Sequence, residues 1–133
     1  MAALDTNVLV RYLVQDEARQ GAAARRLIRG AVEAGGALFV PFTVVLELEW
    51  VLRSSFGFDK AGVLQALFGL LGSFELVFES EGSVEAALGH YADGSADFAD
   101  CLHAALALMA GEQPLWTFDK AAAKVDGARL LAG

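Results

Sequence analysis

The sequence is poor in cysteine and has no long apolar run, and these absences exclude whole classes of protein. Its single cysteine, Cys101, cannot form an internal disulfide, and its apolar helical surroundings predict a packed small hydrophobe. The longest apolar stretch, residues 37–46, is far shorter than a membrane-spanning helix. The first apolar run contains Asp5 and Arg11, which a secretory signal would not. We therefore expect a soluble, cytoplasmic protein that spans no membrane.

Basic residues are also scarce, since ten lysines and arginines face seventeen acids and give a net charge of −7. Nucleic-acid binders normally present a basic surface, so this balance argues against one. Acids gathered around bound cations would be neutralised there, however, which removes part of the objection. Half of the basic residues also cluster within residues 11–29. That cluster is typical either of a solvated helix face or of a contact with RNA or a protein partner, and the candidates are Arg11, Arg25, Arg26 and Arg29.

Apolar residues are abundant, at 56% of the 133 residues with a mean hydropathy of +0.46. This length fits one domain of ordinary size, so we expect a single domain over residues 1–133. The apolar content excludes disorder and predicts a well-filled core or an apolar interface.

Short apolar segments alternate with helical patterns along the whole chain. Strands are predicted at 2–4, 37–41, 75–79 and 114–118, with 128–131 as a candidate fifth. Helices are predicted at 8–13, 17–32, 44–54 with Thr43 as N-cap, 59–71, 83–91 and 97–109. This order predicts an α/β fold of three layers, α/β/α, with a central, mostly parallel sheet of four to five strands.

Two aspartates follow predicted strands, and ligands of such sheets bind beyond the carboxyl ends of the strands. Asp5 stands in Leu-Asp-Thr-Asn, where it fits either a metal ligand or a helix cap, and Asn7 fits either a phosphate contact or a turn. Asp119 follows Trp-Thr-Phe, where Thr117 fits either a ligand contact or an ordinary turn.

Four further acids lie in apolar helical patterns, where acids need an explanation. Glu49 has Arg53 four positions on as an ion-pair partner, which favours Glu47 as the functional acid. Asp97 and Asp100 are three apart and share a helix face, an arrangement that costs stability without a cation. Asp97 fits a helix cap equally well, whereas Asp100 lies deeper in its helix.

Carboxylate oxygens are the ligands that Mg²⁺ and similar hard cations prefer. Such cations lower the pKa of a bound water and stabilise charge in phosphodiester cleavage. No Gly-rich phosphate loop, Ser-His-Asp arrangement or Cys/His metal spacing competes with this interpretation, and His90 and His103 receive no catalytic role.

Four segments taken together resemble PIN-domain nucleases, and more narrowly VapC-like toxins of toxin–antitoxin pairs. They are Leu-Asp-Thr-Asn-Val-Leu-Val-Arg, Glu-Leu-Glu-Trp-Val-Leu, Asp-Phe-Ala-Asp-Cys-Leu and Trp-Thr-Phe-Asp-Lys, in family order over essentially the whole chain. The resemblance implies an acidic quartet of Asp5, Glu47, Asp100 and Asp119 that holds the metal, with Asp97, Asn7 and Thr117 as auxiliary residues. It further implies a Mg²⁺- or Mn²⁺-dependent endoribonuclease that forms a homodimer and is inhibited by a cognate antitoxin.

Two other functions remain open at the level of sequence. A phosphatase of the haloacid-dehalogenase type also begins with an aspartate after its first strand, but it needs a second aspartate where Asn7 stands. A non-catalytic, partner-binding module would use the acids only to attract basic peptides. The apolar helices predicted at 44–54 and 59–71 are a reasonable interface for a second copy.

Overall fold

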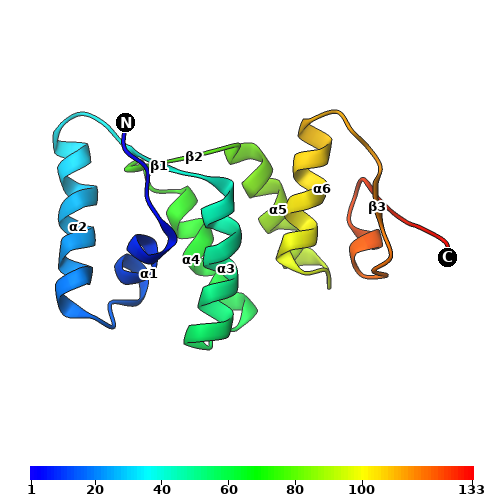
Figure 1. The fold of residues 1–133 in the computed structure, drawn as a ribbon, viewed down its shortest axis with the longest axis horizontal. Coiled ribbons are helices and arrows are strands. Elements are labelled where there is room, and N and C mark those ends of the chain that lie inside the picture. Colours follow the sequence, from blue (N-terminus) through cyan, green and yellow to red (C-terminus); the bar gives the residue numbers. More distant parts are fainter. The chain divides into compact units, whose positions relative to one another are not determined.

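The computed structural model describes residues 1–133 and divides them into two compact units, 1–81 and 82–133. Each unit combines helices with one pair of parallel strands. Figure 1 labels these elements along the chain, and the two units are described separately below.

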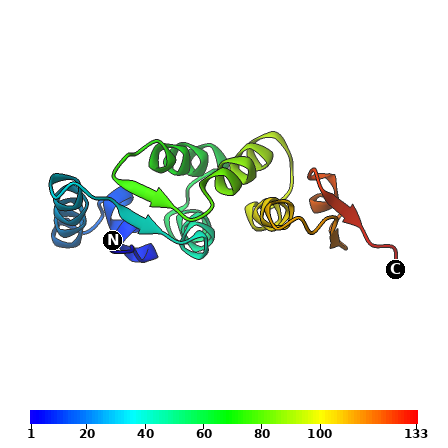
Figure 2. The same ribbon diagram turned by 90° about the horizontal axis from the view of Figure 1, so that it is seen from above.

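The first unit is built on strands β1 (Leu38–Val40) and β2 (Leu76–Phe78), which pair in parallel with Leu38 opposite Leu76. Figure 2 shows the two arrows side by side and pointing the same way. The opposite edge of β1 is occupied by the N-terminal segment, since the amide of Leu4 donates to the carbonyl of Phe39 at 2.9 Å. This contact amounts to a single parallel bridge between Ala3 and Phe39, so the predicted strand at 2–4 is only marginally formed.

Four helices complete this unit: α1 (Thr6–Val14), α2 (Ala18–Glu33), α3 (Phe42–Phe56) and α4 (Lys60–Leu71). Helix α1 packs between α2 and α3, and α3 packs against α4 (Figure 1). The apolar faces of the helices and strands are buried together, among them Leu9, Ile28, Val40, Leu48, Leu52, Val63, Leu67 and Phe78. The helix positions confirm the predictions, and the side chains of Glu17 and Asp59 cap α2 and α4.

The predicted cap at Thr43 is wrong, because α3 begins one residue earlier and Pro41 occupies the N-cap position. Proline suits that position, since its fixed φ, here −63°, allows the extended backbone that precedes a helix. The free amide of Phe42 is satisfied instead by the side chain of Glu79, at 3.2 Å. A residue just after β2 therefore caps a helix that begins just after β1.

The second unit contains α5 (Glu81–Asp93), α6 (Phe98–Met109), a short helix η1 (Ala122–Lys124) and the parallel strands β3 (Leu115–Thr117) and β4 (Ala128–Leu130). Tyr91 at the end of α5 meets Phe98 at the start of α6 edge to face, with ring centroids 5.6 Å apart. Cys101 is fully buried on α6, which confirms its predicted place in the packing.

The α/β class with parallel strands is confirmed, but the sheet is smaller than predicted. Instead of one sheet of four to five strands, the chain forms two sheets of two strands each. The strands are short because helix starts follow them at once: Asp5 caps α1 directly after Leu4, and Pro41 caps α3 directly after β1. No helix has both the length and the apolar content to cross a membrane.

Candidate active site

Asp5 occupies the N-cap position of α1, at the end of the N-terminal segment. One of its carboxylate oxygens, Oδ1, accepts the amide of Thr6 at 2.7 Å. The side chain is exposed, and its second oxygen makes no hydrogen bond within the protein. Asp5 can therefore cap α1 and also bind a metal ion, because capping uses one carboxylate oxygen and leaves the other free.

Glu47 lies exposed on α3, where it accepts a short hydrogen bond from the hydroxyl of Thr6. Thr6 itself is buried, with 3% of its surface exposed. Its amide holds Asp5 and its hydroxyl holds Glu47, so one residue fixes both acids of the first unit. Sequence reasoning missed this role. The only signal in the sequence was a hydroxyl group at a predicted helix start, and Glu47, which accepts its hydrogen bond, is 41 residues away.

Glu49 is the acid that the sequence analysis set aside, and the structure confirms the ion pair on which that choice was based. Its side chain is almost fully buried and forms an ion pair with Arg53 one helical turn on. A buried carboxylate engaged in this way has a structural role in joining successive turns of α3. Glu47 has no Lys or Arg one helical turn away, and its side chain is exposed.

Three aspartates interact electrostatically in the second unit. Burial raises the pKa of Asp100 above its ordinary value, and the charges of Asp119 and Asp97 raise it further, while His103 acts in the opposite direction. Asp97 stands at the N-cap position of α6, yet its side chain makes no capping hydrogen bond. Asp97 therefore occupies the predicted cap position of α6 without the side-chain hydrogen bond of a cap, and its charge acts on Asp100.

Asp119 follows β3 and is held by its neighbours. Its amide donates to the hydroxyl of Thr117 at 3.0 Å, and its Oδ1 accepts the amide of Ala122 at 2.9 Å. Thr117 thus makes the local turn contact that the sequence allowed for it. As at Asp5, one oxygen is engaged by backbone and the other is free.

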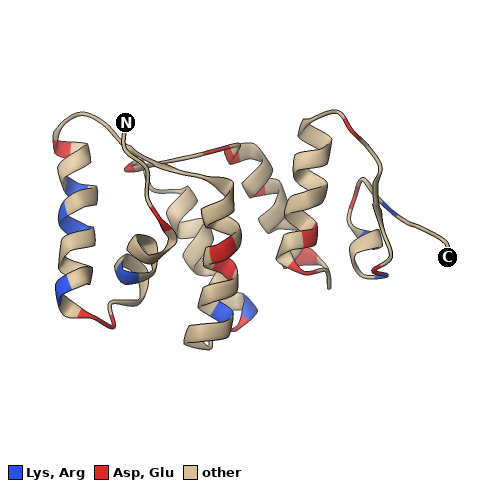
Figure 3. Cartoon of the chain, in the orientation of Figure 1, with Lys and Arg blue, Asp and Glu red and all other residues tan.

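The remaining candidates are polar groups of the first unit. Asn7 is exposed on the first turn of α1 and makes no side-chain hydrogen bond. Arg11 forms an ion pair with Asp16 at 3.0 Å and donates to Gln20 at 2.7 Å. Figure 3 shows the acidic positions on α3 and at the start of α6, and the basic positions along α2.

The acids fit a divalent cation by their chemistry. In neither unit do three or more acidic, histidine or cysteine side chains come together as a ready-made metal site. The pKa of Asp100 is raised first by burial and then by the charges of Asp119 and Asp97, and a cation among these carboxylates would relieve their repulsion. Asp5 and Asp119 each have a free, hard oxygen on an immobilised carboxylate, which is the donor type that such cations prefer.

Comparison with known protein families matches residues 2–128 to the PIN domain. The match extends across both units and includes every candidate acid. The chain therefore belongs to the PIN domain family, whose members are generally nucleases that use divalent metal ions. Comparison with curated proteins finds no match.

Proposed function

We propose that this chain is an endoribonuclease that depends on Mg²⁺ or Mn²⁺ and hydrolyses RNA phosphodiester bonds. Asp5, Glu47, Asp100 and Asp119 are the proposed metal ligands, with Asp97, Asn7 and Thr117 as auxiliary residues. The observation that carries the proposal is the match of residues 2–128 to the PIN domain. It is supported by the like charges of Asp119 and Asp97 that act on Asp100, since a cation would relieve their repulsion.

The bound cation supplies a coordinated water of lowered pKa and charge to offset that of the reacting phosphate. The chain's part is to hold the ligands still. Thr6 orients Asp5 and Glu47, while the amide of Ala122 and the hydroxyl of Thr117 fix Asp119 at the end of β3. Asp97 adds negative charge beside Asp100, which strengthens the attraction for a cation.

The proposal is tested with Asp5→Asn and Asp100→Asn, which keep shape and remove charge. We expect cleavage of labelled RNA to require Mg²⁺ or Mn²⁺ and to fall on the order of 100-fold or more in each variant, as when other transition-state charge stabilisers are removed. Calorimetric titration with Mn²⁺ should show weaker binding in both variants. The matched control is Asp126→Asn, which removes an exposed acid of the second unit and should change neither measurement.

Two results would contradict this function. One is a wild-type chain that shows no cleavage dependent on divalent cations, and the other is full activity in both variants. A wild-type chain that binds no Mn²⁺ would favour the non-catalytic, partner-binding module instead.

We further propose that the nuclease is the toxin of a toxin–antitoxin pair, inhibited by a cognate antitoxin and active as a homodimer. Membership of the PIN domain family and the narrower resemblance of its motifs support this role. The exposed Trp50 of α3 and Phe68 of α4 supply apolar surface for a partner. Expression of the chain should arrest bacterial growth, and expression of Asp100→Asn should not. Growth unaffected by an active nuclease would contradict the toxin role.

A further inference from the structure

Helix α2 carries an unusual concentration of unpaired positive charge. It contains four of the chain's ten basic residues, and its only acid is Glu33 at the last position. The side chains of these arginines form no ion pair and no hydrogen bond within the protein, and Glu33 forms no ion pair with Arg29 one turn before it. The four are Arg19, Arg25, Arg26 and Arg29.

The four arginines occupy one side of the helix. Helical geometry places them within an arc of about 120°, and it separates Arg19 from Arg29 by about 15 Å along the axis. The opposite side, with Ala24 and Ile28, is buried in the core. Arg25 is half-buried at the border, and the other three are exposed. We call this set the arginine face of α2.

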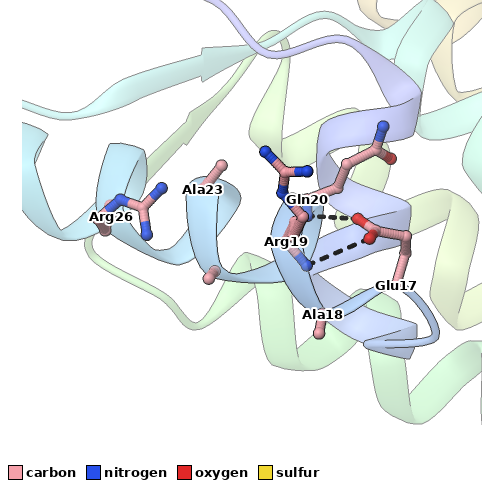
Figure 4. A pocket seen from close by; sticks show the side chains of 7 residues that line it. Glu17, Ala18, Arg19, Gln20, Ala23 and Arg26 are labelled. Atoms are coloured by element: carbon pink, nitrogen blue, oxygen red, sulfur yellow. Dashed lines mark hydrogen bonds between the residues drawn. The ribbon is translucent and has the colours of Figure 1, made fainter.

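An open groove of about 740 Å³ lies along the start of this face. Figure 4 shows Arg19 and Arg26 beside it, with alanine methyl groups between them. Its one acid, Glu17, is turned to the helix end, where its oxygens accept the amides of Arg19 and Gln20. The groove therefore offers guanidinium groups beside small alanine side chains, and the carboxylate of Glu17 is engaged by backbone amides.

This arrangement destabilises the helix when nothing is bound. Arg25 and Arg29 are four apart and Arg26 and Arg29 three apart, and like charges at these spacings on a helix repel one another. Arg19 lies in the first turn, where the helix dipole disfavours a cation. A bound polyanion would offset both effects.

We propose that the arginine face of α2 binds the phosphate backbone of the RNA substrate, in addition to the carboxylates that cut it. This inference rests on the proposed function for the identity of the polyanion. An RNA strand suits the face because the charges extend along the helix rather than converging on one point, and because the guanidinium fork matches phosphate oxygens. Contacts to phosphate carry no sequence information, so we expect this binding to be independent of sequence.

The structure also changes which arginines are expected to take part. Arg11 belongs to the cluster seen in the sequence, but Asp16 and Gln20 already engage its guanidinium. Arg19, in contrast, is exposed and unpaired. Replacing Arg11 therefore serves as the matched control, because it removes one positive charge near the arginine face from a side chain that is already paired.

The test measures binding of fluorescein-labelled, single-stranded RNA by anisotropy over a salt series, with EDTA present to prevent cleavage. Replacing Arg19, Arg26 and Arg29 together by Ala should weaken binding at low salt at least roughly 10-fold. It should also lower the slope of log affinity against log salt by about 2, since each lost phosphate contact contributes about 0.7. The corresponding Lys variant should keep the slope, and Arg11→Ala should bind like wild type. Circular dichroism should show the Ala variant folded, because Ala is the best helix former.

An unchanged salt slope in the triple Ala variant would overturn the inference, as would an equal loss in Arg11→Ala. Competition by polyglutamate at the same charge concentration as RNA would overturn it in favour of an acidic protein partner. Failure of the proposed function is distinguishable, because it is measured as cleavage by the wild-type chain with divalent cations. RNA binding that depends on the face without any cleavage would support the inference and contradict the nuclease.

Discussion

Asp100 is the residue whose ionisation the fold disturbs most clearly. Its position three residues after Asp97 already indicated a shared helix face. The structure shows that burial raises its pKa most. Of the two neighbouring aspartates, Asp119 raises that pKa more than Asp97 does. A carboxyl group in this setting gains more from a bound cation than an isolated surface aspartate does.

The raised pKa of Asp100 predicts how stability depends on pH. Between its unfolded and folded pKa values the folded chain holds more protons than the unfolded chain, so this group's contribution to stability is lost as the pH rises through that window. Without divalent cations, Asp100→Asn should therefore raise the Tm at about pH 7 by roughly 1–3 °C and change little at about pH 3. Thermal melts in EDTA at both pH values measure this. A lower Tm of the variant at neutral pH would contradict the electrostatic interpretation.

Thr6 is a positioning residue for the two acids of the first unit. Thr6→Val keeps the buried shape but removes the hydroxyl that donates to Glu47. We expect Mn²⁺ affinity and RNA cleavage to fall roughly 10- to 100-fold, the usual effect of losing a group that orients a metal ligand. Thr6→Ser retains the hydroxyl and should restore most of both. If the Val variant binds Mn²⁺ as tightly as wild type, Glu47 does not need Thr6.

At the scale of elements, caps explain why the helices begin where they do. Asp59 was predicted to introduce α4, and its Oδ1 accepts the amide of Gly62 at 2.8 Å. The start of α3 was mispredicted, because the first amide of the helix, that of Phe42, donates to the side chain of Glu79, 37 residues away. Local patterns predict a cap when the capping side chain is a sequence neighbour, and they fail when another element provides it.

The cap of α4 gives a prediction for stability. Asp59→Ala removes the side-chain acceptor and should lower the free energy of unfolding by about 1 kcal/mol. Asp59→Ser retains a capping oxygen and should lose much less. Urea denaturation of the three chains measures the difference, and RNA cleavage at low temperature should be unchanged in all of them. Equal stability of the Ala variant and wild type would show that the cap contributes nothing.

For the molecule as a whole, the proposed binding of a cation would add to the stability of the folded chain, because a cation that binds only the folded state stabilises it. At a Mn²⁺ concentration of 100 times Kd, we expect the wild-type chain to gain about 2.7 kcal/mol of stability, seen as a rise in Tm. Asp5→Asn and Asp100→Asn should each lose most of this gain if both residues are ligands. The control Asp126→Asn should keep it. A gain that survives in Asp5→Asn would remove Asp5 from the proposed ligands.

The sequence by itself determined the order of helices and strands, the α/β class and the ion pair that sets Glu49 apart from Glu47. These features depend on neighbours within about one helical turn, such as Arg53 four residues after Glu49. Tertiary structure decided the hydrogen bond of Thr6 with Glu47, the larger part that Asp119 plays in the ionisation of Asp100, and which arginines stay unpaired. Apart from the local pairing of Arg11, these contacts join residues far apart in sequence, and such contacts form only when elements pack together.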